Sequence, residues 1–313
     1  MKMRRQVLAA AIALLAVAAF TGAGSAAQPQ ARSGHGRGRA RPASINTIDT
    51  GRRIDVNNIN MFVTNIGAFA NDAGNVTGGG GEGLYFPKGT TKNAMYAAGP
   101  YFGCIIDSTL HVTVTEYAPE WAPGNILPGS ATAGTPAGTS ADHSNPDFVV
   151  YKMVVWTGDP ADSTHLELTA AQIAADPTAD PLVHHSWNEY MRGAVPYGAP
   201  WKTYRLPDPS VPGDSLDIPG PDVTGDMMLW AVYNDADPST HTNAPGNSAP
   251  IGLEIQQSTF AFNRQGAIGN TVFIKYRIIN KGIQTVTNAY FSQWSDPDPV
   301  SYTHLTLPTI LRV

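Results

Sequence analysis

The segment Thr109-Leu-His-Val-Thr-Val-Thr-Glu-Tyr117 alternates apolar and polar residues with a period of two. Successive side chains of an extended chain point to opposite faces, so this alternation predicts a strand with one face in a core and one face toward water. We expect the buried face to consist of Leu110, Val112 and Val114.

Other β-rich runs, bounded mostly by Gly, Asn, Asp and Pro, follow along the chain. They cover residues 59–66, 93–98, 148–156, 227–233, 253–263, 272–280 and 289–294. Residues 148–156 are apolar enough to be buried on both faces. Because no long helices alternate with these strands, the pattern predicts an all-β fold rather than a parallel α/β sheet. We expect an antiparallel β-sandwich, immunoglobulin-like or jelly-roll-like, with long loops.

One helical insertion interrupts the strands at about residues 158–225. Thr169-Ala-Ala-Gln-Ile-Ala-Ala175 reads as a short helix that Thr169 caps, and a second helix is predicted over residues 183–191. The Pro- and Gly-rich residues 196–225 complete the insertion. A connection of this length between strands is often functional, so we expect either a lid or a cover for one open face of the sandwich.

The N-terminal residues have the pattern of a secretory signal peptide over residues 1–27. A basic start is followed by an apolar stretch and by Ser25-Ala26-Ala27, after which we expect cleavage. The apolar stretch is too short to favour a stable membrane span. Residues 28–45 then form a basic Gly/Arg-rich linker that cannot bury apolar surface, and residues 46–299 are the predicted β-sandwich region.

The C-terminal residues 300–313 resemble a translated sequencing adapter rather than the protein before them. We therefore expect a non-native tail on a truncated fragment of a longer gene product. The authentic sequence downstream of Asp298 would then be missing from this chain.

Composition narrows the class of protein. Hydrophobic residues make up 42% of the chain, enough for a core, while charged residues make up only 14%. The net charge of −5 predicts no nucleic-acid partner, because nucleic-acid binding needs a basic face. Cys104 is the only cysteine and lies in an apolar context, so it reads as a small buried side chain.

Several motifs follow one another along the chain in a characteristic order. They are residues 59–69, Gly83-Leu-Tyr-Phe-Pro-Lys-Gly-Thr90, Tyr96-Ala-Ala-Gly99, Val114-Thr-Glu-Tyr117, Leu229-Trp-Ala-Val-Tyr-Asn-Asp-Ala-Asp237, Phe260-Ala-Phe-Asn263 and Trp294-Ser-Asp-Pro-Asp298. With these motifs the chain resembles the N-terminal β-rich region of large secreted proteins of Bacteroidetes and Ignavibacteria type, which typically end in a type IX secretion sorting domain. The resemblance implies export to the medium or the outer cell surface, but it implies no activity and carries no catalytic residue.

Two acidic turns are candidate calcium sites, because short spacings of oxygen ligands suit this cation. The alternative is that these residues form Asx-turns before proline. The candidate ligands are Asn234, Asp235, Asp237, Asp296 and Asp298.

Exposed aromatic residues are candidates for glycan contact. Trp187 and Trp201 lie in the insertion and are expected to be more exposed than the tryptophans of the apolar strands. Glu116 and Glu120 are a candidate two-carboxylate glycosidase pair, and the alternative is that they are ordinary loop carboxylates. The distance between the two carboxyl groups decides whether such a pair can act.

Two function classes remain open. The first is a non-catalytic module of a secreted or cell-surface protein, structural, adhesive or glycan-contacting, whose partner is an extracellular glycan or a surface protein. The second is the N-terminal part of an exported hydrolase acting on polysaccharide or protein. An acidic cluster with His in one cleft would favour the hydrolase, and scattered acidic residues would favour the module.

Overall fold

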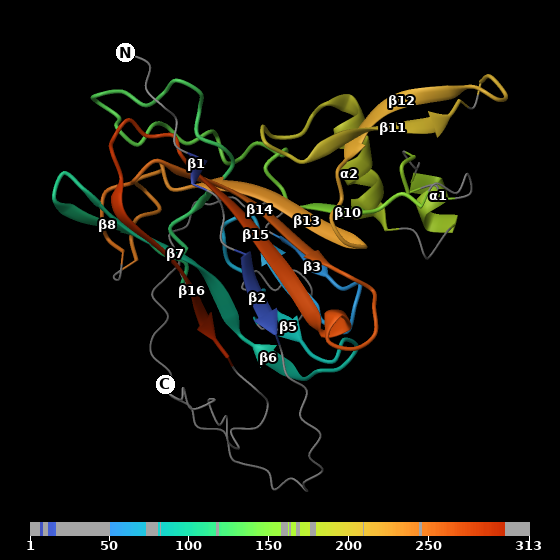
Figure 1. Ribbon diagram of the computed structural model, residues 1–313, viewed down its shortest axis with the longest axis horizontal. Helices are drawn as coiled ribbons and strands as arrows, with labels where there is room; N and C mark the ends of the chain where they lie inside the picture. Colours follow the sequence, from blue (N-terminus) through green and yellow to red (C-terminus); the bar gives the residue numbers. More distant parts are fainter. Residues whose placement is uncertain are drawn as a thin grey trace, which may run out of the picture.

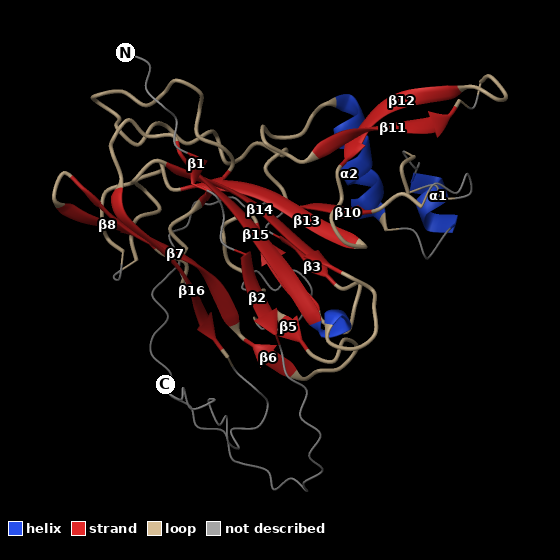
Figure 2. Cartoon of the chain, in the orientation of Figure 1, coloured by secondary structure: helices blue, strands red, loops and turns tan. Residues whose placement is uncertain are grey.

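The computed structural model describes residues 51–72, 81, 83–116, 119–157, 162, 164–166, 170–175, 180–208, 210–243 and 246–297, together with the backbone of residues 7–8 and 12–16. Strands hold 41% of the residues and helices 8%. The pairings between named strands are antiparallel, so the prediction of an all-β, sandwich-like fold with long loops is confirmed (Figures 1 and 2).

The first layer is an antiparallel sheet in the order β15–β14–β13–β10. A short strand, β9, pairs with the end of β13, while β1 and β2 pair with the outer edge of β15. The strands are β10 (Tyr151–Val154), β13 (Met227–Asn234), β14 (Leu253–Ala261), β15 (Thr271–Asn280), β9 (Ala122–Pro123), β1 (Val7–Leu8) and β2 (Ile12–Ala16).

The second layer consists of two smaller sheets joined by an isolated bridge between Phe69 and Ala98. One has the order β3–β4–β5–β6 and the other β16–β7–β8. A short 3-10 helix, η1, leads into β15. The elements are β3 (Gly51–Ile54), β4 (Asn60–Thr64), β5 (Leu84–Tyr85), β6 (Asn93–Met95), β7 (Ala97–Ile106), β8 (Thr109–Thr113), η1 (Ile268–Asn270) and β16 (Thr287–Asp296).

The main core lies between the two layers. Alternate residues of β14 and β15, such as Ile255 and Ile274, meet Val63 and Phe102 from the second layer. Burying these apolar side chains removes their surface from water, which is the main force that holds the two layers together. One polar pair lies inside this core, where Gln257 accepts a hydrogen bond from the Tyr233 hydroxyl at 2.7 Å.

A second apolar cluster covers the other face of the first sheet. Met228, Trp230 and Val232 of β13 point to this side, where Tyr151 and Tyr190 pack against them. Every residue of β13 is therefore buried, and β10 is buried at Tyr151 through Met153, as the apolar run 148–156 predicts.

The insertion contains α1, α2 and a hairpin of two strands, and it lies beside β10 at one end of the sandwich (Figure 1). Asp180 caps α2 by accepting a hydrogen bond from the Leu182 N–H at 3.0 Å, and Gly193 ends it in a left-handed conformation with φ 68°. The elements are α1 (Ala170–Ala175), α2 (Pro181–Arg192), β11 (Trp201–Pro207) and β12 (Ser215–Pro221).

The predicted facing of residues 109–117 is wrong at Leu110 and at Thr113. Leu110 is 62% exposed, whereas Thr113 is fully buried. The outer end of β8 extends beyond the core, so Leu110 has no apolar layer to cover it (Figure 1). Thr113 is buried at low free-energy cost because its hydroxyl donates a hydrogen bond to Asp235 at 2.9 Å.

Strand β16 is the last strand on its side of the second layer. Most of its residues are exposed, the others are half-buried, and Tyr290 is 75% exposed. β16 contacts β15 of the first layer through its side chains, because the rings of Phe291 on β16 and Tyr276 on β15 have centroids 5.1 Å apart.

Candidate functional site

One face of the β11–β12 hairpin packs against α2, and the other face is open to solvent. Tyr204 and Leu206 point inward and are buried. Trp201, Thr203 and Arg205 have the opposite parity on β11 and are exposed. We call Trp201, Thr203 and Arg205, with Asp217 opposite Arg205, the hairpin surface.

The inner face holds this hairpin surface in place. Trp187 of α2 packs against Tyr204 with ring centroids 5.0 Å apart, and the Tyr204 hydroxyl donates to the Pro221 carbonyl at 2.7 Å. Gly220 is needed here, because a Cβ atom at this position would lie 2.4 Å from the Trp187 ring. The hairpin is thereby a supported platform rather than a free loop.

The two tryptophan candidates for glycan contact occupy opposite sides of this hairpin. Trp201 is 63% exposed, as expected. The expectation of exposure is wrong for Trp187, which is fully buried, because the hairpin covers the face of α2 that carries it. Trp187 is therefore a core residue of the insertion.

The hairpin surface also carries charge. Arg205 and Asp217 face each other across the two strands with 3.7 Å between their charged groups, and both side chains are largely exposed. Tyr197, four residues before Trp201, is 72% exposed. Exposed aromatic and arginine side chains on a fixed support are the residue types enriched at binding surfaces.

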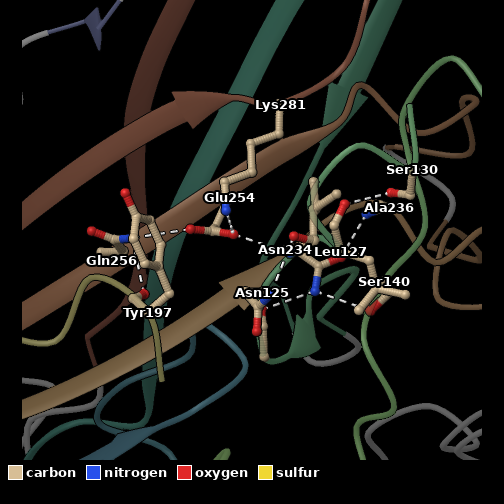
Figure 3. Close-up of polar contacts among 12 residues, drawn as sticks. Asn125, Leu127, Ser130, Ser140, Tyr197, Asn234, Ala236, Glu254, Gln256 and Lys281 are labelled. Carbon is tan, nitrogen blue, oxygen red and sulfur yellow. Dashed lines mark hydrogen bonds and ion pairs between the residues drawn. The ribbon is translucent and has the colours of Figure 1, made fainter. Parts of the chain in front are cut away.

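A polar ladder lies next to Tyr197 on the outer face of β14 and β15 (Figure 3). We define it as Glu254, Gln256, Arg277 and Lys281. The buried carboxylate of Glu254 accepts hydrogen bonds from Lys281 and from Gln256, the latter at 3.0 Å. Arg277 then donates to the Gln256 side-chain oxygen at 2.9 Å.

The polar ladder also fastens two segments that cross the sheet. The Ile126 N–H donates to Glu254 at 3.0 Å, and Gln256 donates to the Tyr197 carbonyl at 3.4 Å. The Lys281 ammonium lies 5.4 Å from the Tyr197 ring, a cation–π distance. The buried charge of Glu254 is thus paired and hydrogen-bonded, which such a charge requires.

Asn234 and Asp235, two of the calcium candidates, are both used as hydrogen-bond partners. The Asn234 amide donates to the Gly124 carbonyl at 2.9 Å and to Ser140 at 3.0 Å (Figure 3). The Asp235 carboxylate is fully buried and accepts from the Thr113 hydroxyl and from three successive backbone N–H groups, at residues 251–253. Through these hydrogen bonds, both side chains hold neighbouring loops in place.

Asp237 forms an Asx-turn, which was the alternative to a calcium site. Its carboxylate accepts a hydrogen bond from the Ser239 N–H at 2.9 Å. Asp296 lies at the end of β16 in the other layer, and Asp298 falls outside the described residues. Within the described part of the chain, no group of three or more His, Cys, Asp and Glu side chains has a geometry that could hold a metal ion.

Glu116 and Glu120, the candidate glycosidase pair, differ sharply in surroundings. Glu120 is fully buried, and its carboxylate accepts hydrogen bonds from the backbone N–H groups of Val114, Asn243 and Asn247. Burial raises the pKa of Glu120, and these hydrogen bonds partly oppose that shift. Glu116 instead accepts a hydrogen bond from the Tyr101 hydroxyl.

Cys104 is buried at 1% exposure, as its apolar context predicts. Burial raises the pKa of the Cys104 thiol to about 11, with a smaller contribution from the negative charge of Asp235. The thiolate is the nucleophilic form, so this side chain is suited to packing rather than to chemistry.

Three residues of this region, Tyr197, Arg205 and Asp217, were not predicted from the sequence as part of a site. The alternation of residues 201–207 was a usable signal, but Pro207 and the prolines of the partner strand made the segment read as loop. Pairing of β11 with β12 is what brings Asp217 opposite Arg205.

Comparison of the sequence with models of protein families, with curated proteins and with solved structures finds no match. Within the described residues, no helix has the length and apolar character needed to cross a membrane. The family resemblance given above therefore stays a prediction.

Proposed function

We propose that this chain is a non-catalytic module of an exported protein that contacts extracellular glycans through the hairpin surface. The observation that carries this proposal is the 63% exposure of Trp201 on a hairpin whose other face is packed against α2. A flat indole ring offers an apolar face to the apolar side of a sugar ring, and its position is fixed by the strand below it.

Polar groups further along the same face of the hairpin suit the hydroxyl groups of such a ligand. Arg205 supplies hydrogen-bond donors and Asp217 acceptors, and both remain open to solvent in their 3.7 Å ion pair. The export part of the proposal is supported by the signal-peptide pattern of residues 1–27.

The hydrolase alternative receives less support from the described acidic residues. Asp235, Glu254 and Glu120 are all fully buried and accept several hydrogen bonds each. A catalytic acid must reach the proton that it transfers, which a fully buried carboxylate held by several other hydrogen bonds is poorly placed to do.

Polysaccharide binding by the exported protein tests the proposal. Soluble β-glucan, xylan, mannan, chitin oligomers and alginate serve as probes, with tryptophan fluorescence and affinity electrophoresis as readouts. We expect at least one probe to bind and Trp201→Ala to weaken that binding at least tenfold, the size of effect typical of a central aromatic contact. Tyr290→Ala, an equally exposed aromatic on β16, is the matched control and should bind like the wild type.

Three outcomes contradict the proposal. Binding of none of the five probes, or equal binding by Trp201→Ala, removes the hairpin surface as the contact. Release of reducing ends from any probe by the wild type, lost in Glu116→Gln, favours the hydrolase instead.

A further inference from the structure

The outer edge of β15 has an unusual occupant. Its antiparallel partners on that side are β2, which pairs with residues 271–275, and β1, which pairs at Ile278 and Ile279 (Figure 1). Both partners belong to residues 1–27, the predicted signal peptide. The sheet edge is therefore filled by a segment that export is expected to remove.

Removal of that segment would leave β15 as an open edge. A strand at the edge of a sheet presents a row of unpaired N–H and C=O groups, which is a template for another strand. β15 is 10 residues long and contains no proline to blunt the edge. It also borders the main core, because Val272, Ile274, Tyr276 and Ile278 are core residues.

The side chains of β15 define which strand fits there. Residues directly opposite each other on paired strands lie on the same face, where opposite charges stabilise and like charges destabilise the pair. The core side of β15 is apolar, whereas the other side carries the exposed Lys275 and Arg277 between the half-buried Phe273 and Ile279. A complementary strand therefore alternates apolar residues with acidic residues where it faces Lys275 and Arg277.

We infer that the β15 edge of the exported protein is an acceptor for an extended segment of a partner polypeptide, with apolar and acidic residues in alternation. The segment adds a strand to the first sheet, covers the rim of the main core, and pairs its carboxylates with Lys275 and Arg277. The inference rests on the export part of the proposed function, but it is independent of glycan contact by Trp201.

Two labelled ten-residue peptides test the inference, one alternating Val with Glu and one alternating Val with Lys. The full chain is produced with its own leader in an exporting bacterium, and intact mass establishes the first residue of the exported protein. Fluorescence anisotropy should show the Val/Glu peptide binding at least tenfold more tightly than the Val/Lys peptide. The double variant Lys275→Glu/Arg277→Glu should reverse this preference.

The matched control is Lys88→Glu/Lys92→Glu, which alters the net charge by the same amount but at exposed residues near β5 and β6. It should keep the preference of the wild type. Amide hydrogen exchange adds a readout of strand pairing, because bound peptide should slow exchange within residues 271–280 and leave β16 unchanged.

Four results would overturn the inference. These are equal binding of both peptides, no added protection of β15, an exported protein that retains residues 7–16, and a dimer with β15 already protected in the absence of peptide. The last result would show that a second copy fills the edge. Polysaccharide binding measured on the same sample separates any of these failures from failure of the glycan proposal.

Discussion

Four hydrogen bonds converge on the buried carboxylate of Asp235, and they come from two separate parts of the chain. Asp235→Ala would leave three backbone N–H groups in the interior without an acceptor. Each such group costs about 1–3 kcal/mol, so we expect the free energy of unfolding to fall by about 3 kcal/mol or more. Urea denaturation followed by tryptophan fluorescence measures this loss.

The control for Asp235 is Asp217→Ala, whose side chain is 62% exposed. We expect that change to alter the free energy of unfolding by less than about 0.5 kcal/mol, because exposed ion pairs contribute little. Equal effects of the two substitutions would contradict the role assigned to Asp235.

Cys104 makes stability depend on pH in the alkaline range. An unfolded cysteine ionises near pH 8.5, whereas burial holds the pKa of Cys104 at about 11 in the folded chain. Between these values the unfolded state has lost the proton that the folded state keeps. This group therefore lowers the free energy of unfolding by about 1.4 kcal/mol for each pH unit across that window.

Urea denaturation of the wild type and of Cys104→Ala at pH 8, 9 and 10, with reductant present, checks this dependence. Buried tyrosines, such as Tyr233, titrate in both proteins and cancel in the comparison. We expect the variant to lose less stability from pH 8 to pH 10. If the free energies of unfolding of the two proteins depended on pH in the same way, Cys104 would have the same pKa in the folded and the unfolded state.

At the scale of elements, sequence reasoning located the strands well and the insertion poorly. The run of residues 227–233 corresponds to β13 and residues 272–280 to β15, because long apolar or alternating runs have few other solutions. β11 and β12 were missed since both are partly polar, β11 ends in a proline and β12 contains two prolines. These two segments form strands because they pair with each other and pack on α2, and no local sequence pattern predicts such contacts.

The candidate site was predicted only in part for the same reason. Trp201 was named correctly as exposed, but the burial of Trp187 depends on a hairpin that had not been foreseen. The facing of Leu110 and Thr113 was predicted wrongly, because it depends on residues outside the strand. Leu110 lies beyond the core, and Thr113 is buried where its hydroxyl reaches Asp235, which lies more than a hundred positions away in the chain.

Trp187 should therefore control the stability of the insertion. Trp187→Ala removes the centre of the small core formed with Val183, Tyr204 and Leu206. Replacing a buried tryptophan by alanine costs about 3–5 kcal/mol, and we expect most of that loss within the insertion. Limited proteolysis should then cut between β11 and β12 in the variant, while the sandwich remains resistant. Trp201→Ala should keep the hairpin intact, and cleavage of both variants at one rate would contradict the division between core and surface.

At the scale of the whole molecule, the polar ladder joins three parts that are distant in sequence. Glu254 contacts the segment at Ile126 and the lysine at position 281, and Gln256 reaches the insertion at Tyr197. Lys281→Met would leave the buried Glu254 charge without its counter-ion. Breaking a buried pair in this way costs about 3–5 kcal/mol.

A double-mutant cycle separates the pair from its surroundings. We expect Lys281→Met to lower the melting temperature more than Glu254→Gln/Lys281→Met does, because the double variant buries no unpaired charge. Thermal unfolding followed by circular dichroism is the measurement. If the double variant were less stable than Lys281→Met, the pair would not be the unit that holds these parts together.

Strand β16 has a practical consequence for anyone who concentrates this protein. Its sequence Thr-Asn-Ala-Tyr-Phe-Ser-Gln-Trp-Ser-Asp contains three aromatic residues, one charge and no proline, and its outer edge carries none of the lysines that usually discourage stacking. At high concentration, copies should join edge to edge into ordered, dye-binding filaments while each remains folded. Shelf life in solution would then be set by an exposed strand rather than by the melting temperature, and a single lysine in place of Tyr290 should extend it.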